Sequence, residues 1–174
     1  MSHEMIELLK SRRSIRSFED RPIPEDVLHT IAETALYAPS AMNRQSWHFV
    51  VMTDRAELDA LAAQVKARLN LDERYRFYHC QALILATNDP IENPMAVDDC
   101  ACALQNIFLA AHALGVGSVW INQLRHVCDD PEIRAMLTSL GVPPHHAVYG
   151  AAALGYPRKP PQEKTIRPDR ITYR

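Results

Sequence analysis

Residues 38–52 read Ala38-Pro39-Ser40-Ala41-Met42-Asn43-Arg44-Gln45-Ser46-Trp47-His48-Phe49-Val50-Val51-Met52. The stretch joins the end of one element to the start of another through a polar loop. Pro39 disfavours helical backbone at Ala38, so a helix arriving from the N-terminal side should end there. The run from Trp47 to Met52 is short and rich in β-branched and aromatic residues, which favours a strand. The sequence therefore predicts a helix, a loop and a strand in direct succession.

The flanking segments continue this alternation of helices and strands. Pro24, followed by two acids and by apolar residues at helical spacing, predicts the start of the helix that ends near residue 38. Asp54 and Glu57 form a capping pair for the next helix. Further helices are expected at 4–11, 96–114 and 130–140, and further strands at 82–86, 118–121 and 147–154. Because single strands alternate with helices, we expect residues 1–174 to form one domain with helices on both faces of a sheet.

The composition is that of a globular chain, with 47% hydrophobic and 23% charged residues among 174. It contains only 5 glycines, at positions 115, 117, 141, 150 and 155. No Walker loop and no dinucleotide-binding fingerprint can be assembled from those positions. If this protein binds a phosphate-bearing ligand, it must do so without a glycine-rich loop.

The net charge of −2 is distributed unevenly. Residues 158–174 hold six basic and two acidic side chains, residues 1–22 hold five and four, and the residues between them hold eight and fifteen. An acidic body argues against a nucleic-acid surface, so no nucleic-acid partner is expected. The basic chain ends would form a local anion site if they met, and a solvated basic tail is the alternative.

The four cysteines do not follow the spacing of a disulfide framework or of a common zinc site. The side chains considered for zinc are Cys100, Cys102, His112, His126 and Cys128. Two residues apart on a helix, Cys100 and Cys102 should face opposite sides, so we expect no metal site.

No membrane partner is expected either. The most apolar run, residues 100–114, is shorter than the roughly 20 residues that a membrane span needs, which favours a buried helix. The first residues lack the apolar stretch of a secretory signal, and we therefore expect a cytoplasmic protein.

Two segments could carry chemistry. Arg12-Arg13-Ser14-Ile15-Arg16 concentrates positive charge with no acid among its residues, and arginine forks match phosphate oxygens. Exposed arginines, or arginines paired with nearby acids, are the alternative reading of this segment. The amides in the loop over residues 40–46 offer both donors and acceptors, so the loop could bind the edge of a flat heterocycle. An ordinary connector is the alternative there.

Four segments together resemble the nitroreductase family of FMN-dependent oxidoreductases. They are Arg-Arg-Ser-Ile-Arg at 12–16 followed by Phe18, Ala-Pro-Ser-Ala-Met-Asn-Arg-Gln-Ser-Trp-His-Phe at 38–49, Gly-Val-Gly-Ser-Val-Trp-Ile at 115–121, and Leu-Gly-Tyr-Pro at 154–157 before a basic tail. The resemblance covers nearly the whole chain in order. It implies an α+β fold, with a mostly antiparallel central sheet sandwiched by helices, in an intertwined homodimer. The flavin would lie at the subunit interface, so the tail and the arginine segment that share its phosphate could come from different subunits.

The resemblance also implies roles for single residues. Arg12 and Ser14 are expected at the flavin phosphate, and Arg16 beside the isoalloxazine ring as the residue that acts in catalysis. Arg13 is expected to bind the cofactor as well. The other implied contacts are Pro39, Ser40, Ala41, Asn43, Asn70, Trp120, Ile121, Lys164 and Arg167. A fixed arginine such as Arg16 would stabilise the negative charge of reduced flavin electrostatically.

The implied activity is the reduction of nitroaromatics, quinones or similar small-molecule acceptors by ping-pong hydride transfer. FMN would be tightly but not covalently bound, and NADH or NADPH would be a transient reductant. The alternative is a flavin-binding protein with little turnover, serving as an FMN carrier, a sensor or the partner of a dedicated electron donor.

Overall fold

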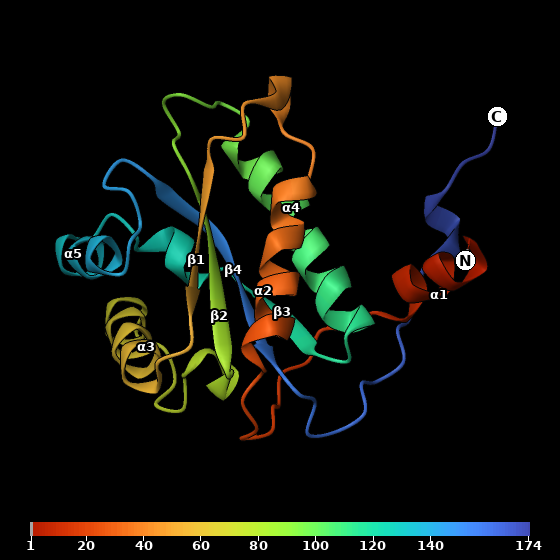
Figure 1. Ribbon diagram of the computed structural model, residues 1–174, viewed down its shortest axis with the longest axis horizontal. Coiled ribbons are helices and arrows are strands. Elements are labelled where there is room, and N and C mark those ends of the chain that lie inside the picture. The colour runs from red at the N-terminus through yellow and green to blue at the C-terminus, as the bar shows by residue number, and fades with distance from the viewer. Residues whose placement is uncertain (1) are drawn as a thin grey trace.

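The computed structural model describes residues 2–174 (Figure 1). Its helices and strands are α1 (Ser2–Ser11), α2 (Glu25–Glu33), β1 (Trp47–Met52), α3 (Arg55–Leu69), β2 (Ala82–Asn88), α4 (Ala96–Ala113), β3 (Gly117–Ile121), α5 (Pro131–Ser139) and β4 (Ala147–Gly155). Short 3-10 turns are η1 (Thr34–Tyr37), η2 (Ala41–Asn43), η3 (Phe77–His79), η4 (Gln123–His126) and η5 (Pro168–Arg170). The four strands expected from the sequence are all present, three of them longer than expected by one or two residues.

The strands form a single sheet in the order β1-β2-β4-β3, and every neighbouring pair is antiparallel. At one end of the sheet, Trp47 of β1 pairs with Asn88 of β2. At the other end, Gly117 of β3 pairs with Gly155 of β4. The α+β class and the antiparallel sheet implied by the resemblance are confirmed.

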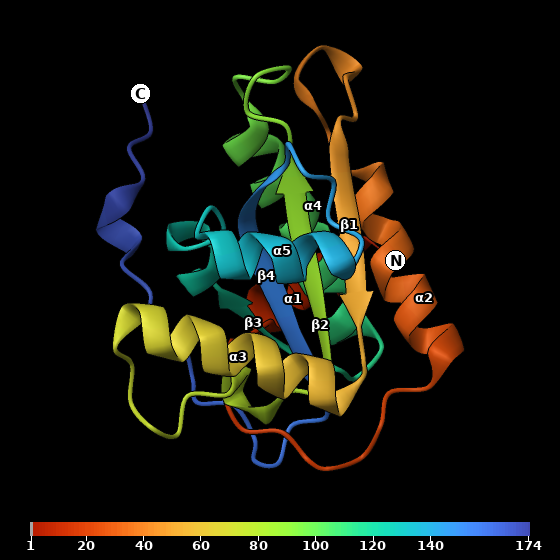
Figure 2. The same ribbon diagram turned by 90° about the vertical axis from the view of Figure 1, so that its left-hand side faces the viewer.

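Helices cover both faces of the sheet, as expected. Helices α3 and α5 lie on one face, and α2 and α4 on the other (Figure 2). In β2, Leu83 and Leu85 pack with the cluster that includes α3 and α5, whereas Ile84 packs with the cluster that includes α2 and α4. Alternate side chains of a strand point to opposite faces, so all seven β2 residues are buried. This is why the strand reads as a continuous apolar run.

The second helix ends differently from the expectation. Helix α2 stops at Glu33, and the chain continues to Tyr37 as the 3-10 turn η1. Ala38 has extended backbone, with φ −70° and ψ 151°. Proline at the next position excludes helical backbone at Ala38, and the last turn tightens before it.

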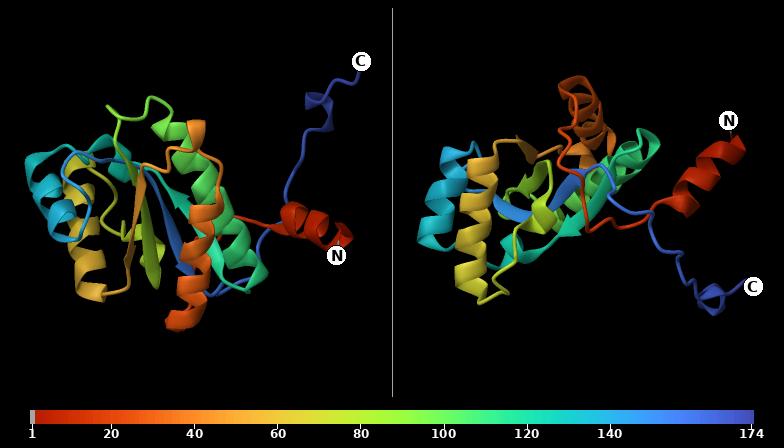
Figure 3. Two further views of the ribbon diagram at one scale, coloured as in Figure 1. Left: turned by 45° about the horizontal axis from the view of Figure 1, so that its top comes forward. Right: turned by 90° about the horizontal axis from the view of Figure 1, so that it is seen from below.

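Both chain ends project from the body of the protein (Figure 3). Helix α1 extends away from the sheet, and its apolar residues Met5, Ile6 and Leu9 are exposed. The tail after residue 157 is exposed throughout and contains only η5. The two ends therefore offer surface that the rest of the chain does not cover.

Within residues 2–174, no helix is both long and apolar enough to cross a membrane. The same residues contain no group of three histidine, cysteine or acidic side chains placed to hold a metal ion. On α4, Cys100 is buried and Cys102 is exposed, so the two thiols do face opposite sides of the helix.

Candidate functional site

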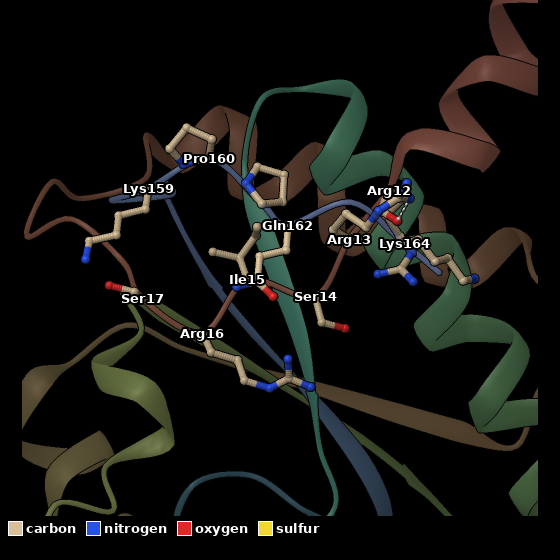
Figure 4. A pocket seen from close by; sticks show the side chains of 11 residues that line it. Arg12, Arg13, Ser14, Ile15, Arg16, Ser17, Lys159, Pro160, Gln162 and Lys164 are labelled. Atoms are coloured by element: carbon tan, nitrogen blue, oxygen red, sulfur yellow. Dashed lines mark hydrogen bonds between the residues drawn. The ribbon is translucent and has the colours of Figure 1, made fainter. Parts of the chain in front are cut away.

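The arginine segment is anchored on the edge of the sheet by its one apolar residue. The backbone N–H of Ile15 donates to the carbonyl oxygen of Ser118 at 2.9 Å, and Ser14 bridges Ser118 in a parallel sense. Ile15 is 8% exposed. Side chains alternate along an extended backbone, so Ser14 and Arg16 point away from Ile15 (Figure 4). The buried isoleucine therefore sets the direction of the polar residues beside it.

Two glycines allow this segment to lie close to the sheet. A Cβ at Gly117 would come within 2.9 Å of the Ile15 side chain, and a Cβ at Gly155 within 2.8 Å of the Phe18 ring. Phe18 is buried and bridges Pro157, which follows β4. Three of the four segments noted in the sequence thus meet at one end of β3 and β4.

Arg158 joins the start of the tail to the same segment. Its backbone N–H donates to the carbonyl oxygen of Ser17 at 3.0 Å, and its Nε donates to that of Phe18 at 2.9 Å. Its Nη2 forms an ion pair with the Asp20 carboxylate at 3.2 Å. The basic tail therefore leaves β4 alongside the arginine segment.

The arginine segment and the tail enclose a cavity of about 530 Å³, which we call the basic cavity (Figure 4). Its lining residues are Arg12, Arg13, Ser14, Ile15, Arg16, Ser17, Lys159, Pro160, Pro161, Gln162 and Lys164. Five of them are basic and none is acidic. Among the described residues, none of these five side chains forms an ion pair. A lining of unpaired cations and hydroxyls suits a phosphate group.

The cations at this cavity are held close together at an electrostatic cost. Arg12 lies 5.9 Å from the centre of the Phe108 ring, and burial together with the charge of Arg13 lowers the pKa of Arg12. Arg13 donates from Nη1 to the carbonyl oxygens of Lys10 at 2.6 Å and of Arg12 at 2.9 Å, beside the end of α1. An anion in the cavity would offset the repulsion between these arginines.

A second, smaller cavity of about 230 Å³ adjoins the basic cavity and shares Arg13 and Ile15 with it. His112 lines it and lies 2.8 Å through Nε2 from the Ser11 hydroxyl. Burial and then the charges of Arg12 and Arg13 lower the pKa of His112. The imidazole therefore adds no further positive charge at neutral pH.

The polar loop that precedes β1 lies at the other end of the sheet (Figure 1). Trp47 directly follows the loop and pairs with Asn88 at one end of β2. Ser118 lies next to the arginine segment and pairs with Leu154 of β4. Leu154 in turn pairs with Ala82 at the other end of β2. The length of β2 between Ala82 and Asn88 is about 20 Å. Four expected flavin contacts are consequently absent from the basic cavity of the same chain: Pro39, Ser40, Ala41 and Asn43.

Comparison with known proteins gives this arrangement a family. A family model described as "Nitroreductase family" matches residues 9–156. The chain belongs to the nitroreductase family. A protein of Archaeoglobus fulgidus with the provisional name NADH dehydrogenase/NAD(P)H nitroreductase is 33% identical over 176 residues, which is 97% of this chain and 96% of its own.

Solved nitroreductase structures are also similar to this chain. A nitroreductase from Bacteroides fragilis with bound FMN is 41% identical, has a TM-score of 0.91 and is matched over 98% of each chain. A nitroreductase from Desulfitobacterium hafniense, also with bound FMN, is 26% identical, has a TM-score of 0.89 and is matched over 99% of each chain. These structures establish the nitroreductase fold for this chain.

In this chain, three of the expected flavin contacts lie outside the basic cavity on other elements. Asn70 ends α3 in the left-handed conformation, with φ 50° and ψ 48°, and its N–H bonds to Lys66. This local role in ending the helix accounts for the asparagine there. On β3, Ile121 is buried, whereas Trp120 is 38% exposed and packs 6.0 Å from the Phe108 ring.

The tail places one of the two expected basic residues in the basic cavity. Lys164 lines it, whereas Arg167 does not. Lys159 also lines the cavity, two residues after Pro157, and was not among the residues expected from the sequence. The pairing of Phe18 with Pro157 has no signal in the sequence. Without that pairing, nothing indicates that the residues just after Leu-Gly-Tyr-Pro lie near the arginines.

Proposed function

We propose that this member of the nitroreductase family binds FMN and uses NADH or NADPH to reduce small acceptors. The observation that carries the proposal is the basic cavity. It gathers basic side chains from both ends of the chain and two serines from the N-terminal segment, and no acidic side chain lines it. Among the described residues, its five basic side chains form no ion pair. FMN is the ligand named for the solved relatives from Bacteroides fragilis and Desulfitobacterium hafniense. The donor set fits the phosphate of that cofactor.

The residues of the cavity have separable tasks in this proposal. Arg12, Ser14, Lys159 and Lys164 would bind the phosphate, because their donors line one cavity. FMN would supply the hydride acceptor and donor chemistry. Arg16 is exposed at the same cavity, and its guanidinium would stabilise negative charge that develops beside it.

The position of the polar loop leads us to propose a homodimer. Within one chain the loop and the basic cavity lie at opposite ends of the sheet, so one flavin cannot contact both. A second copy would bring its loop with Pro39, Ser40, Ala41 and Asn43 to the cavity of the first. The exposed apolar face of α1 and the projecting tail would lie against that copy. Each subunit would be one domain comprising residues 1–174.

The acceptors we propose are nitroaromatics, quinones or related compounds, reduced in a ping-pong cycle in which the nicotinamide leaves before the acceptor enters. No dedicated acid or base is needed, because an acceptor can take its proton from water. A flavin-binding protein with little turnover is the second candidate. A cytoplasmic location stays a prediction from the sequence.

The test begins with the absorbance spectrum of the purified protein. Wild-type protein should be yellow, and a variant with Arg12→Ala and Arg16→Ala should lose the flavin. Arg74→Ala is the matched control, because this exposed arginine lies outside both chain ends and pairs with its neighbour Asp72 among the described residues. Colourless wild-type protein that cannot be reconstituted with FMN would contradict the proposal.

Turnover separates the two candidates. NADH and NADPH oxidation should be measured with and without a quinone or nitroaromatic acceptor. Catalytic oxidation that depends on the acceptor supports the enzyme. Slow reduction without acceptor dependence supports the flavin-binding alternative.

A further inference from the structure

The loop between α2 and β1 has an unusual backbone. Met42, Asn43 and Gln45 have φ values of 54°, 55° and 50°, in the left-handed region that glycine normally occupies. Side chains with a Cβ adopt this region at a cost, so surrounding contacts must hold the conformation. The loop contains no glycine to reduce that cost.

Hydrogen bonds within the loop hold part of this conformation. The backbone N–H of Gln45 donates to the Ser40 hydroxyl at 3.1 Å, and the Gln45 amide donates to Asn43 Oδ1 at 2.9 Å. These three side chains are partly or largely exposed, however, and water competes for such bonds. Internal contacts alone are therefore a weak restraint on the loop.

Two buried side chains outside the loop hold both of its ends. Asp99 Oδ1 accepts the backbone N–H of Ala41 at 2.9 Å, and Asp99 Oδ2 accepts Nδ2 of Asn93 at 2.7 Å. The same Nδ2 donates to the Ser46 hydroxyl at 3.2 Å. One connected network thus links the first residue of η2 with the last residue before β1.

Asp99 is a buried carboxylate that accepts hydrogen bonds from neutral donors. It is 4% exposed and Asn93 is 0% exposed, and among the described residues Asp99 has no cationic partner. It lies in the first turn of α4, where the helix dipole favours a negative charge. A buried carboxylate that is stabilised only by neutral donors needs each of those bonds. The preceding residue, Asp98, is exposed, and among the described residues the hydrogen bonds from this region to the loop come from Asp99 and Asn93.

We propose that Asp99, with Asn93, is a positioning residue that holds the polar loop in the conformation that contacts the flavin. The inference rests on the proposed function, because it takes the loop to be part of the flavin site. Asp99 acts through the Ala41 N–H and does not itself line the basic cavity. A preformed loop loses less conformational freedom when FMN binds, so the anchor should raise the affinity for FMN.

The donor and acceptor pattern of the pair allows a rescue experiment. Asp99→Asn puts an NH2 group opposite the NH2 group of Asn93, and two donors cannot bond. Adding Asn93→Asp restores the bond with its direction reversed, and the amide oxygen at position 99 can still accept the Ala41 N–H. Asp98→Asn is the matched control, since it removes the same charge from the same helical turn.

FMN binding to the refolded or flavin-stripped full-length protein is measured by quenching of flavin fluorescence, and the flavin midpoint potential is measured for each variant. Asp99→Asn should weaken FMN binding about tenfold and shift the potential, as expected for one lost charged hydrogen bond. The exchanged pair should recover most of the affinity, and Asp98→Asn should match wild type.

The inference fails if Asp99→Asn binds FMN as tightly as wild type, or if the exchanged pair binds as weakly as Asp99→Asn. Failure of the proposed function looks different, because the wild-type protein would then not bind FMN at all. Hydrogen exchange of the Ala41 amide gives a readout without flavin: exchange should accelerate in Asp99→Asn and slow again in the exchanged pair.

Discussion

Ile15 fixes the backbone of the arginine segment on the sheet, whereas a dinucleotide-binding fold uses a glycine turn to bring its backbone N–H groups close to the phosphate. The Ile15 N–H bonds to β3 and the Ile15 side chain packs against Gly117, so the backbone that carries Arg12, Ser14 and Arg16 cannot shift. Phosphate recognition is thereby left to side chains. The scarcity of glycine in the sequence is consistent with this arrangement, because close approach requires glycine only where the segment touches the sheet.

The first prediction, at the residue scale, concerns the tail. Lys159→Ala and Lys164→Ala should each raise the dissociation constant for FMN about tenfold, because each removes a cation from the cavity that would bind the phosphate. Arg167→Ala should change it little, since Arg167 lies outside that lining. Titrations at low and high salt check the result. A larger effect for Arg167 than for Lys164 would assign the phosphate contact to the other candidate.

The second prediction concerns His146, which is 7% exposed and lies 3.0 Å through Nδ1 from the Thr87 hydroxyl. Burial, and then the charges of His145 and His48, lower the pKa of His146 below its usual 6.5. The unfolded chain therefore binds a proton more readily than the folded one. The stability linked to this group is fully present above pH 6.5 and is lost as the pH falls.

Melting temperatures measured between pH 8 and pH 5 check this prediction. The wild-type protein should lose stability on the acidic side, and His146→Gln should flatten the part of the profile just below pH 6.5. His29→Gln is the control, because His29 is exposed. An unchanged slope in His146→Gln would show that other groups cause the loss.

At the scale of elements, Arg158 is the junction between the N-terminal segment and the tail. It bonds to Ser17, Phe18 and Asp20, so the N-terminal segment holds the first residue of the tail at three points. The third prediction is that Arg158→Ala lowers FMN affinity about tenfold although Arg158 does not line the cavity, since the tail lysines lose their placement. Arg74→Ala, which alters an exposed arginine outside both chain ends, should have no such effect.

Limited proteolysis checks the cause of that loss. In Arg158→Ala the bonds after residue 157 should be cleaved faster than in the wild type, while the body of the protein stays intact. Weak FMN binding with unchanged cleavage would argue that Arg158 acts on the ligand directly.

The sequence predicted elements whose signals are local. Strands β1 and β2 were predicted from runs of β-branched and apolar residues. Helix α5 was predicted from Asp130 before Pro131, and the Asp130 side chain does cap this helix. The turn over Phe77, Tyr78 and His79 was not predicted, because three left-handed residues in succession carry no glycine or asparagine as a signal. Tertiary contacts determine such a turn.

The assembly of the site was predictable only in part. The arginine segment could be identified because its charges lack nearby acids. Its attachment to Ser118 and Pro157 depends on pairings more than 100 residues apart, which no local pattern encodes. Asn93 and Asp99 were missed for the same reason, since each looks like an ordinary polar residue before or within a helix.

At the scale of the whole molecule, the two parts of the proposed flavin site lie far apart in one chain. The basic cavity is at one end of the sheet and the polar loop is at the other. A two-fold dimer resolves this division, because each copy then gives its loop to the cavity of the other. The exposed α1 and tail extend from the end that carries the cavity (Figure 3). The chain ends would thus hold the partner, and they line the cavity that the partner's loop completes.

The fourth prediction tests this arrangement with two defective proteins. One carries Arg12→Ala, and the other carries Ser40→Ala with Asn43→Gly, which suits the positive φ at that position. Each homodimer has two damaged sites. In a mixed dimer one site receives both lesions, and the other combines the intact cavity of one chain with the intact loop of its partner. Unfolding and refolding an equal mixture should therefore restore about a quarter of the FMN sites. If each site were made by a single chain, mixing would restore none, and the flavin absorbance of the refolded mixture would equal the mean of the two separate variants.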